Sequence, residues 1–288
     1  MSKACAILLF CIVSIHGVIS GQTATLPVDT IQIGNQGQEL LIDTEGSSIH
    51  TTRAFDSLIQ ELTVYKNSNS KKSKEFRDRG RNHARSGEYE LAVTDFTMAI
   101  KLNRRDPNLY KNRANAYKNL GQHDREEADY SVAIYLKIDD LKVYLNRGHA
   151  RLKLGKHDEA ISDFTFYIDE ENPNSAKNLI SAFRGRANAH KHLSQFFQAI
   201  LNYSEVIDRN RKLGQKEARA FTNRGAMYLK NHEYDKAIDD LTIALEMDET
   251  KEFEAYKYRA KAYEALGKGD LQEKDMAKYR KMKDLDSK

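Results

Sequence analysis

The sequence predicts an all-α protein in which pairs of antiparallel helices stack into a solenoid. The first reason is a motif of an aromatic residue, two variable residues, an arginine and a glycine or alanine, which occurs six times. The copies lie 34, 34, 39, 38 and 35 residues apart, a period typical of helix–turn–helix repeats. The second reason is composition, because the 288 residues include three prolines and no tryptophan. The six motifs begin at Phe76, Tyr110, Tyr144, Phe183, Phe221 and Tyr256.

Residues 1–21 have the pattern of a signal peptide. Lys3 supplies a positive charge, Ala4–Ile15 is almost entirely apolar, and Ser20 and Gly21 provide a small-residue cleavage point. The apolar run is shorter than the roughly 20 residues that a membrane-spanning helix needs. An uncleaved membrane anchor is therefore the less favoured alternative. We expect export through the secretory pathway to a periplasm, a lumen or the extracellular medium.

Residues 22–72 form a predicted leader that is largely unstructured. Apolar residues at helical spacing predict one short amphipathic helix near 53–65. The following segment, 67–74, contains only Asn, Ser and Lys and is predicted to be a polar linker. We expect the folded repeat domain to span residues 73–283 and a short tail to span 284–288.

The repeated segment resembles the tetratricopeptide repeat family, whose unit begins three residues before the aromatic residue. The resemblance implies a right-handed superhelix of repeats, each made of a helix A followed by a helix B. It places the repeat starts near residues 73, 107, 141, 180, 218 and 253. The sixth helix B is heavily charged, so this repeat is expected to act as a cap. Insertions near 174–177 and 214–216 are expected to lengthen two loops between repeats.

The same register predicts the packing of helix A on helix B. Small residues, such as Gly80, Gly148 and Gly225, are expected where the two helices approach closely. One large residue of each helix B is expected in the core, at Phe96, Tyr130, Phe164, Tyr203 and Leu241. Glycine is expected to end helix A at Gly87, Gly121, Gly155 and Gly267. Glu126 occupies a small-residue position, which predicts a local shift of register towards Ala128.

A ladder of salt bridges is expected between helices A and B. The seventh residue of every repeat is arginine, and the twenty-third is aspartate in five of the six repeats, with Asn202 as the exception. Semi-buried arginine–carboxylate pairs commonly fix the geometry of packed helices, so we interpret these residues as structural. A ligand-binding row of arginines is the weaker alternative. The ladder comprises Arg79, Arg113, Arg147, Arg186, Arg224 and Arg259 with Asp95, Asp129, Asp163, Asp240 and Asp275.

A basic groove is expected on helix A, because in the family five positions of this helix line the concave surface. Fourteen of the thirty such positions are basic and two are acidic, although the whole chain carries a net charge of only +4. This separation of charge predicts a positive groove, unless the basic residues merely solvate an exposed face. The expected ligand-binding residues are Arg77, Arg81, Lys111, Asn112, Asn115, Lys142, Asn146, Arg184, Asn188, Asn223, Lys257 and Lys261.

The carboxylate clamp of some family members is incomplete in this sequence. Starting at the second repeat, Lys111, Asn115 and Asn146 match the clamp, whereas Ser181 and Gly185 do not. The recurring asparagines are still expected to bond the backbone of a bound peptide.

Enzyme function is not expected. Both cysteines, Cys5 and Cys11, lie in the predicted signal peptide, and the sequence has no HExxH, Gly-x-Ser-x-Gly or phosphate-loop motif. His190 and His192 are two residues apart on a helix and face different sides, which makes a poor metal pair. We therefore expect no catalytic residue, no metal and no cofactor.

The sequence predicts an exported interaction scaffold that holds an acidic or extended segment of a partner protein. One alternative is a polyanion or nucleic-acid binder that uses the same basic face. Nucleic acid is disfavoured, because the groove lacks interleaved aromatic residues for base stacking. The other alternative is a purely architectural assembly subunit. The sequence does not indicate an oligomeric state.

Overall fold

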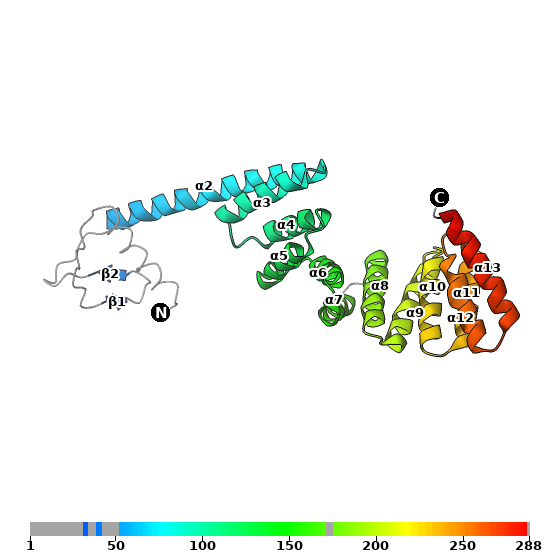
Figure 1. The fold of residues 1–288 in the computed structure, drawn as a ribbon. Helices are drawn as coiled ribbons and strands as arrows, with labels where there is room; N and C mark the ends of the chain where they lie inside the picture. The colour runs from blue at the N-terminus through cyan, green and yellow to red at the C-terminus, as the bar shows by residue number, and fades with distance from the viewer. Residues whose placement is uncertain (1–30, 34–38, 42–51, 171–174, 287–288) are drawn as a thin grey trace. The chain divides into compact units, whose positions relative to one another are not determined.

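The computed structural model describes residues 31–33, 39–41, 52–170 and 175–286 (Figure 1). The chain divides into two compact units, residues 1–68 and 69–288. The predicted signal peptide lies outside the described residues. In the first unit, β1 (Ile31–Ile33) pairs antiparallel with β2 (Glu39–Leu41), so two short strands lie in the segment expected to be unstructured.

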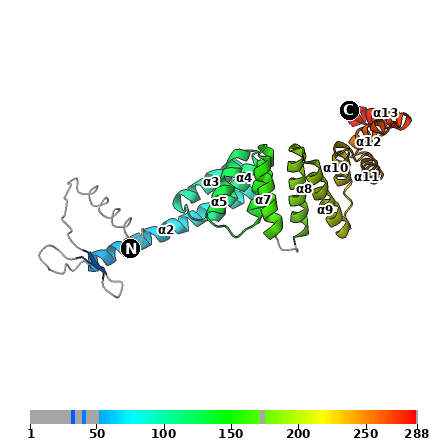
Figure 2. The ribbon, with the colours of Figure 1, turned by 90° about the horizontal axis from the view of Figure 1, so that it is seen from below.

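The described part of the chain contains twelve helices, and the second unit is a solenoid of helix pairs, as the sequence predicts. Each helix from α3 onward packs against the next one along the chain (Figures 1 and 2). The helices are α2 (Thr52–Arg85), α3 (Tyr89–Leu102), α4 (Pro107–Asn119), α5 (His123–Tyr135), α6 (Lys142–Lys153), α7 (His157–Glu170), α8 (Ala176–His192), α9 (Phe196–Lys212), α10 (Ala218–Lys230), α11 (Tyr234–Met247), α12 (Glu254–Ala265) and α13 (Gly269–Asp286).

The even-numbered helices are the A helices and the odd-numbered ones are the B helices. Two pairs of A helices from neighbouring repeats, α6 with α8 and α10 with α12, contact each other directly. Direct contact requires the A helices of adjacent repeats to lie close together. The A helices therefore form the shorter, inner side of these parts of the stack.

Each repeat buries one large side chain of helix B against small residues of helix A. Phe96, Tyr130, Phe164, Tyr203 and Leu241 are all buried, as the sequence predicts. A Cβ atom on Gly148 would lie 2.8 Å from the ring of Phe164, which is closer than real Cβ atoms approach. Glycine is therefore required there for the two helices of the third repeat to pack.

Helix A ends in a left-handed residue in all six repeats. Glycine holds this position in four repeats, at Gly87, Gly121, Gly155 and Gly267. In the other two repeats Ser194 and His232 adopt φ values of 57° and 61°. Because a side chain disfavours this conformation, these two turns are less favourable than the glycine turns.

Three expectations about local structure differ from the observed helices. The short helix near 53–65 and the linker at 67–74 are one continuous helix, α2. The linker contains no proline or glycine, so a helix on either side propagates through it at little cost. Near the two insertions, α8 and α9 are each 17 residues long, longer than α4 or α5. The connection between α9 and α10, residues 213–217, is no longer than that between α5 and α6, residues 136–141, so this insertion lengthens the helices and not the loop.

Candidate functional site

Arginine–carboxylate pairs join helix A to helix B in five repeats. In the third repeat, Arg147 Nε and Nη2 donate to the two carboxylate oxygens of Asp163, at 3.0 and 2.6 Å. Paired donors that meet both oxygens fix the orientation of the two helices as well as binding them. The five pairs are Arg79–Asp95, Arg113–Asp129, Arg147–Asp163, Arg224–Asp240 and Arg259–Asp275.

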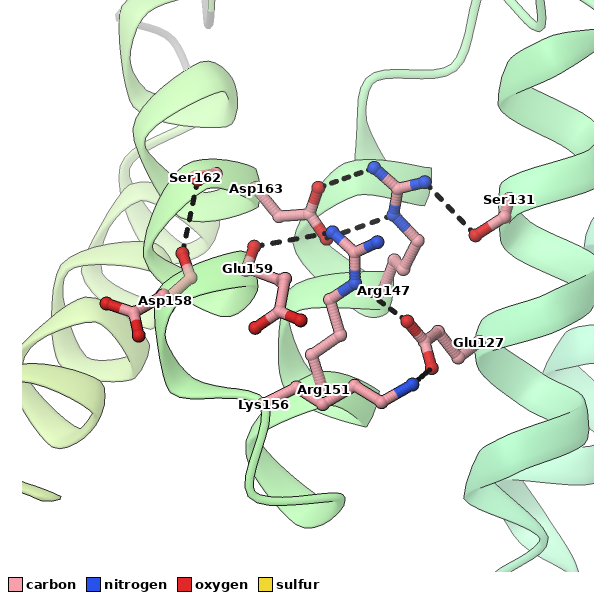
Figure 3. A network of polar contacts seen from close by, with 9 residues as sticks. All are labelled: Glu127, Ser131, Arg147, Arg151, Lys156, Asp158, Glu159, Ser162 and Asp163. Carbon is pink, nitrogen blue, oxygen red and sulfur yellow. Dashed lines mark hydrogen bonds and ion pairs between the residues drawn. The ribbon is translucent and has the colours of Figure 1, made fainter.

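A row of hydroxyl groups, which was not predicted from the sequence, ties the ladder arginines of the second to sixth repeats to the preceding repeat. Arg147 Nη1 donates to Ser131 Oγ of α5 at 3.1 Å (Figure 3). The signal is a serine or threonine two residues after the ladder acid or amide of the first five repeats, whereas Ala277 holds this position in the sixth. Each arginine therefore links two repeats, through the bonds Arg113–Thr97, Arg147–Ser131, Arg186–Thr165, Arg224–Ser204 and Arg259–Thr242.

The ladder pair of the fourth repeat is weaker than the others. Arg186 Nε donates to Asn202 Oδ1 at 2.8 Å, so a neutral amide replaces the carboxylate. Burial lowers the pKa of Arg186. In the second repeat burial acts in the same direction, but the bonds to Asp129 outweigh it and raise the pKa of Arg113. The buried guanidinium of the fourth repeat is therefore less well compensated.

Several predicted groove cations already have a carboxylate partner. Lys111 Nζ lies 3.1 Å from Asp140, and Arg184 Nη2 lies 2.5 Å from Glu217. Both acids directly precede or begin the next helix A, so these pairs fix the connection between repeats. The other paired cations are Arg77 and Arg81 with Asp78, and Lys257 with Glu254. Their charge is compensated locally, and they supply less positive potential than the sequence analysis assigned to them.

Two of the predicted groove asparagines are held by core tyrosines. Tyr130 and Tyr203 donate their hydroxyl hydrogens to Oδ1 of Asn115 and Asn188, at 2.6 and 2.7 Å. An amide whose oxygen is engaged in this way still has its N–H groups to donate. These two side chains are therefore oriented as hydrogen-bond donors.

The remaining predicted groove residues have different surroundings. Asn146 Oδ1 accepts from Lys118 Nζ at 3.5 Å. Asn112 Nδ2 is buried and has no partner among the described residues. Asn223 is half-buried, and Lys142 and Lys261 form no ion pair within the described part of the chain. The structure thus does not bring all twelve predicted residues into one site.

A pocket of about 480 Å³ opens on the A helices of the second, third and fourth repeats. Three lysines surround it, Lys118 on α4, Lys153 on α6 and Lys191 on α8, and we call them the lysine cluster. None of the three forms an ion pair with a described residue. The lining consists of Lys118, His123, Glu126, His149, Ala150, Leu152, Lys153, Asn188, Lys191 and His192.

Burial and neighbouring cations act in the same direction on Lys191 and His149 of this pocket. Burial lowers the pKa of Lys191, and the charge of Arg219 lowers it further. Burial likewise lowers the pKa of His149 to about 4, and the charges of Lys118, Arg184 and Lys153 act in the same direction. A cation is therefore disfavoured at both positions, and an anion would be favoured.

One carboxyl group lines the pocket, and it is turned towards a histidine. Glu126 is buried, and its Oε2 lies 2.9 Å from His123 Nδ1. Burial raises the pKa of this carboxyl group. The predicted shift of register towards Ala128 is wrong, because Ala128 is exposed and Glu126 itself occupies the small-residue position.

A second, smaller pocket of about 250 Å³ lies on the last repeat. It brings Lys257 and Lys261 together with Glu264, Tyr279 and Arg280. Its lining holds three cations and one carboxyl group, as the lining of the larger pocket does, but here Lys257 is also paired with Glu254.

The described residues give no sign of a metal centre or a membrane span. No group of three or more His, Cys, Asp and Glu side chains in this part of the chain could hold a metal ion. No helix in the described ranges is both long enough and apolar enough to cross a bilayer.

Comparisons with known proteins agree with the repeat architecture. Models of the tetratricopeptide repeat match residues 77–140, 141–165 and 218–251. No curated protein matches the sequence.

Several solved structures share the fold at low sequence identity. MamA residues 41 to the end from Desulfovibrio magneticus has a TM-score of 0.55 at 18% identity, over 62% of this chain and 96% of that one. YrrB, described as a TPR protein with an unusual peptide-binding site, has a TM-score of 0.55 at 17% identity, over 68% and 92%. A tetratricopeptide repeat protein from Parabacteroides merdae has a TM-score of 0.58 at 17% identity, over 74% and 80%.

The family assignment follows from three concordant findings. Six copies of the motif recur at the family's period, and their helices pair and pack in the family's register. Family models match three separate stretches of the sequence, and the fold matches solved structures of such proteins. The chain is therefore a tetratricopeptide-repeat protein.

Proposed function

We propose that this protein is an exported interaction scaffold that binds an acidic, extended segment of a partner protein over its A helices. The tetratricopeptide fold supports a role in protein–protein interaction. The structural relative YrrB is described as having an unusual peptide-binding site. The predicted signal peptide at residues 1–21 is the basis for export.

The observation that carries this proposal is the lysine cluster. Elsewhere on the A helices, cations such as Lys111 and Arg184 are matched by carboxylates, whereas Lys118, Lys153 and Lys191 form no ion pair among the described residues. Three lysines held around a single carboxyl group, Glu126, leave an excess of positive charge that costs free energy. A ligand with negative charge removes that cost, so the cluster favours an acidic partner.

The remaining lining of the pocket suits a polypeptide. Asn188 of the lining is held by the Tyr203 hydroxyl group in the orientation of a donor, which is suitable for the carbonyl groups of an extended backbone. Asn115 on α4, outside the lining, is held by Tyr130 in the same way. The lysines would accelerate association through long-range attraction, while the asparagines would fix the direction of the bound chain.

Charge reversal of the lysine cluster tests the proposal. The variant Lys118→Glu/Lys153→Glu/Lys191→Glu is compared with the wild type for binding of a fluorescent deca-aspartate peptide by anisotropy. We expect at least tenfold weaker binding, about 1.4 kcal/mol, and a steep loss of wild-type affinity with added salt. The matched control is Lys101→Glu/Lys177→Glu/Lys212→Glu, which changes the net charge equally at exposed lysines outside the pocket.

The same variants separate the proposal from its alternatives. A partner captured from the exported fraction by the wild type and by the control, but not by the cluster variant, supports the proposal. Equal capture by all three would contradict it and favour an architectural role. Tighter binding of a single-stranded oligonucleotide than of deca-aspartate at equal charge would favour the polyanion alternative.

A further inference from the structure

Four histidines gather at the pocket, one from each of four consecutive helices. His123 begins α5, His149 lies within α6, His157 begins α7 and His192 ends α8. His123, His149 and His192 line the pocket, and His157 stacks on His192. No group in the described residues is arranged to hold a metal ion, so metal binding does not explain the cluster.

His149 lies at the centre of the positive charges of the pocket. Its Nε2 lies 3.0 Å from Ser181 Oγ, and its ring packs edge-on against Phe164. The cations that act on it come from three helices, namely Lys118 on α4, Lys153 on α6 and Arg184 on α8. An imidazole in this position is neutral in the empty pocket, because a further positive charge is unfavourable there.

His192 has a comparable environment at the edge of the pocket. Its ring stacks on that of His157 with centroids 4.7 Å apart and an interplanar angle of 4°. Burial lowers the pKa of His192, and the charges of His157 and Lys191 lower it further. His157 Nδ1 is buried without a hydrogen-bond partner among the described residues.

His123 differs from the other three histidines because it already faces a carboxyl group. Its Nδ1 lies 2.9 Å from Glu126, and Lys118 acts on the same carboxyl group. Glu126 is thus the one acidic group of the pocket lining, and its titration is a second possible source of pH dependence beside that of the histidines.

An anion in this pocket would shift the equilibrium between the neutral and protonated forms of His149 and His192. Negative charge within a few ångströms favours the protonated form of an imidazole. Binding of the anion and binding of the proton therefore favour each other, and thermodynamic linkage makes this effect reciprocal.

We propose that the pocket takes up a proton on His149 or His192 when it binds an acidic segment, so that acidification tightens the complex. This inference rests on the proposed function and adds its regulation. Affinity rises as pH falls, because the bound state holds more protons than the free state.

The first test follows the affinity for fluorescent deca-aspartate between about pH 7.5 and about pH 5.5, where aspartates with an ordinary pKa of about 3.9 stay charged. Ionic strength is held constant. We expect the wild type to bind about tenfold more tightly at the acidic end, within the limit of tenfold per pH unit for each proton taken up. His149→Gln/His192→Gln should change less than about twofold over the same range.

Two control variants locate the proton. His190→Gln is on α8, and its Nδ1 is bonded to Gln195 outside the pocket lining, so this variant should keep the wild-type pH dependence. Glu126→Gln should also keep it. If Glu126→Gln removes the pH dependence and the histidine variant retains it, the assignment to histidine is overturned.

Calorimetry of the wild type tests the inference without any substitution. Titration of deca-aspartate near pH 6 in two buffers of different ionisation enthalpy gives the number of protons taken up. A net uptake supports the inference, and the absence of uptake overturns it. Binding that is independent of pH but abolished by reversal of the lysine cluster would overturn this inference alone. Binding that is unaffected by that reversal would overturn the proposed function.

Discussion

The arginine ladder and the pocket use basic side chains in opposite ways. In the ladder, a guanidinium meets a carboxylate at two hydrogen-bond distances, as in Arg147 with Asp163, and also reaches a hydroxyl of the neighbouring repeat. In the pocket, Lys118, Lys153 and Lys191 have no carboxylate partner among the described residues. Charges that are paired within the protein orient its helices, whereas cations that form no ion pair can be neutralised by an anionic ligand.

The largest expected effect comes from removing one carboxylate of the ladder. Asp163 is buried and accepts from both Arg147 and Arg151 (Figure 3). Asp163→Ala leaves two guanidinium groups without this partner and should lower the free energy of unfolding by about 3–5 kcal/mol. Urea denaturation measures the loss. The exposed Asp158 on the same helix is the control, and Asp158→Ala should cost less than about 1 kcal/mol.

The pocket should make the protein sensitive to acid through His149. Its folded-state pKa of about 4 is below the ordinary value of 6.5, so the unfolded chain takes up the proton first as pH falls. Protonation of His149 therefore has no effect on the free energy of unfolding above pH 6.5, and it lowers that free energy progressively as the pH falls from 6.5 to 4. At about 1.4 kcal/mol per pKa unit, the loss reaches up to about 3 kcal/mol. The difference between wild type and His149→Gln in urea denaturation should follow this window, and a constant difference would contradict it.

Restoring the missing carboxylate of the ladder should have the opposite sign. Asn202→Asp gives Arg186 the same partner that the other five repeats have. We expect a gain of about 1–2 kcal/mol above neutral pH, because hydrogen bonds to charged groups are stronger than those to neutral amides. Thermal unfolding measures the gain. The double variant Asn202→Asp/Arg186→Gln should lose it if the gain comes from the ion pair.

The smallest expected effect concerns the turns that connect helices A and B. Ser194 holds a left-handed conformation that glycine adopts in four other repeats. Ser194→Gly should therefore stabilise the protein by about 0.5–1 kcal/mol, since the relief of strain exceeds the entropic cost of glycine. The inverse change, Gly155→Ser, should destabilise the third repeat by a similar amount. Denaturation midpoints measure both, and equal midpoints for Ser194→Gly and wild type would refute the prediction.

Repeat boundaries and ladder partners could be predicted from the sequence because they depend on spacing. The arginine and the acid of each ladder pair are sixteen residues apart, and that interval places them across the two helices of one repeat. The hydroxyl row could have been found in the same way, since Thr97, Ser131 and Thr165 also recur at one position of the repeat. The extent of α2 was not predicted, because a polar composition does not prevent a helix from continuing.

The sequence by itself determined the class of fold, the repeat register, the ladder and the excess of cations on helix A. Only the tertiary structure decided which of those cations are neutralised, because Lys111 and Asp140 are 29 residues apart and meet where the second repeat connects to the third. It also decided that histidines from α5, α6, α7 and α8 gather at one pocket. Periodicity fixes the face of a helix on which a residue lies, whereas the stacking of repeats fixes what that face meets.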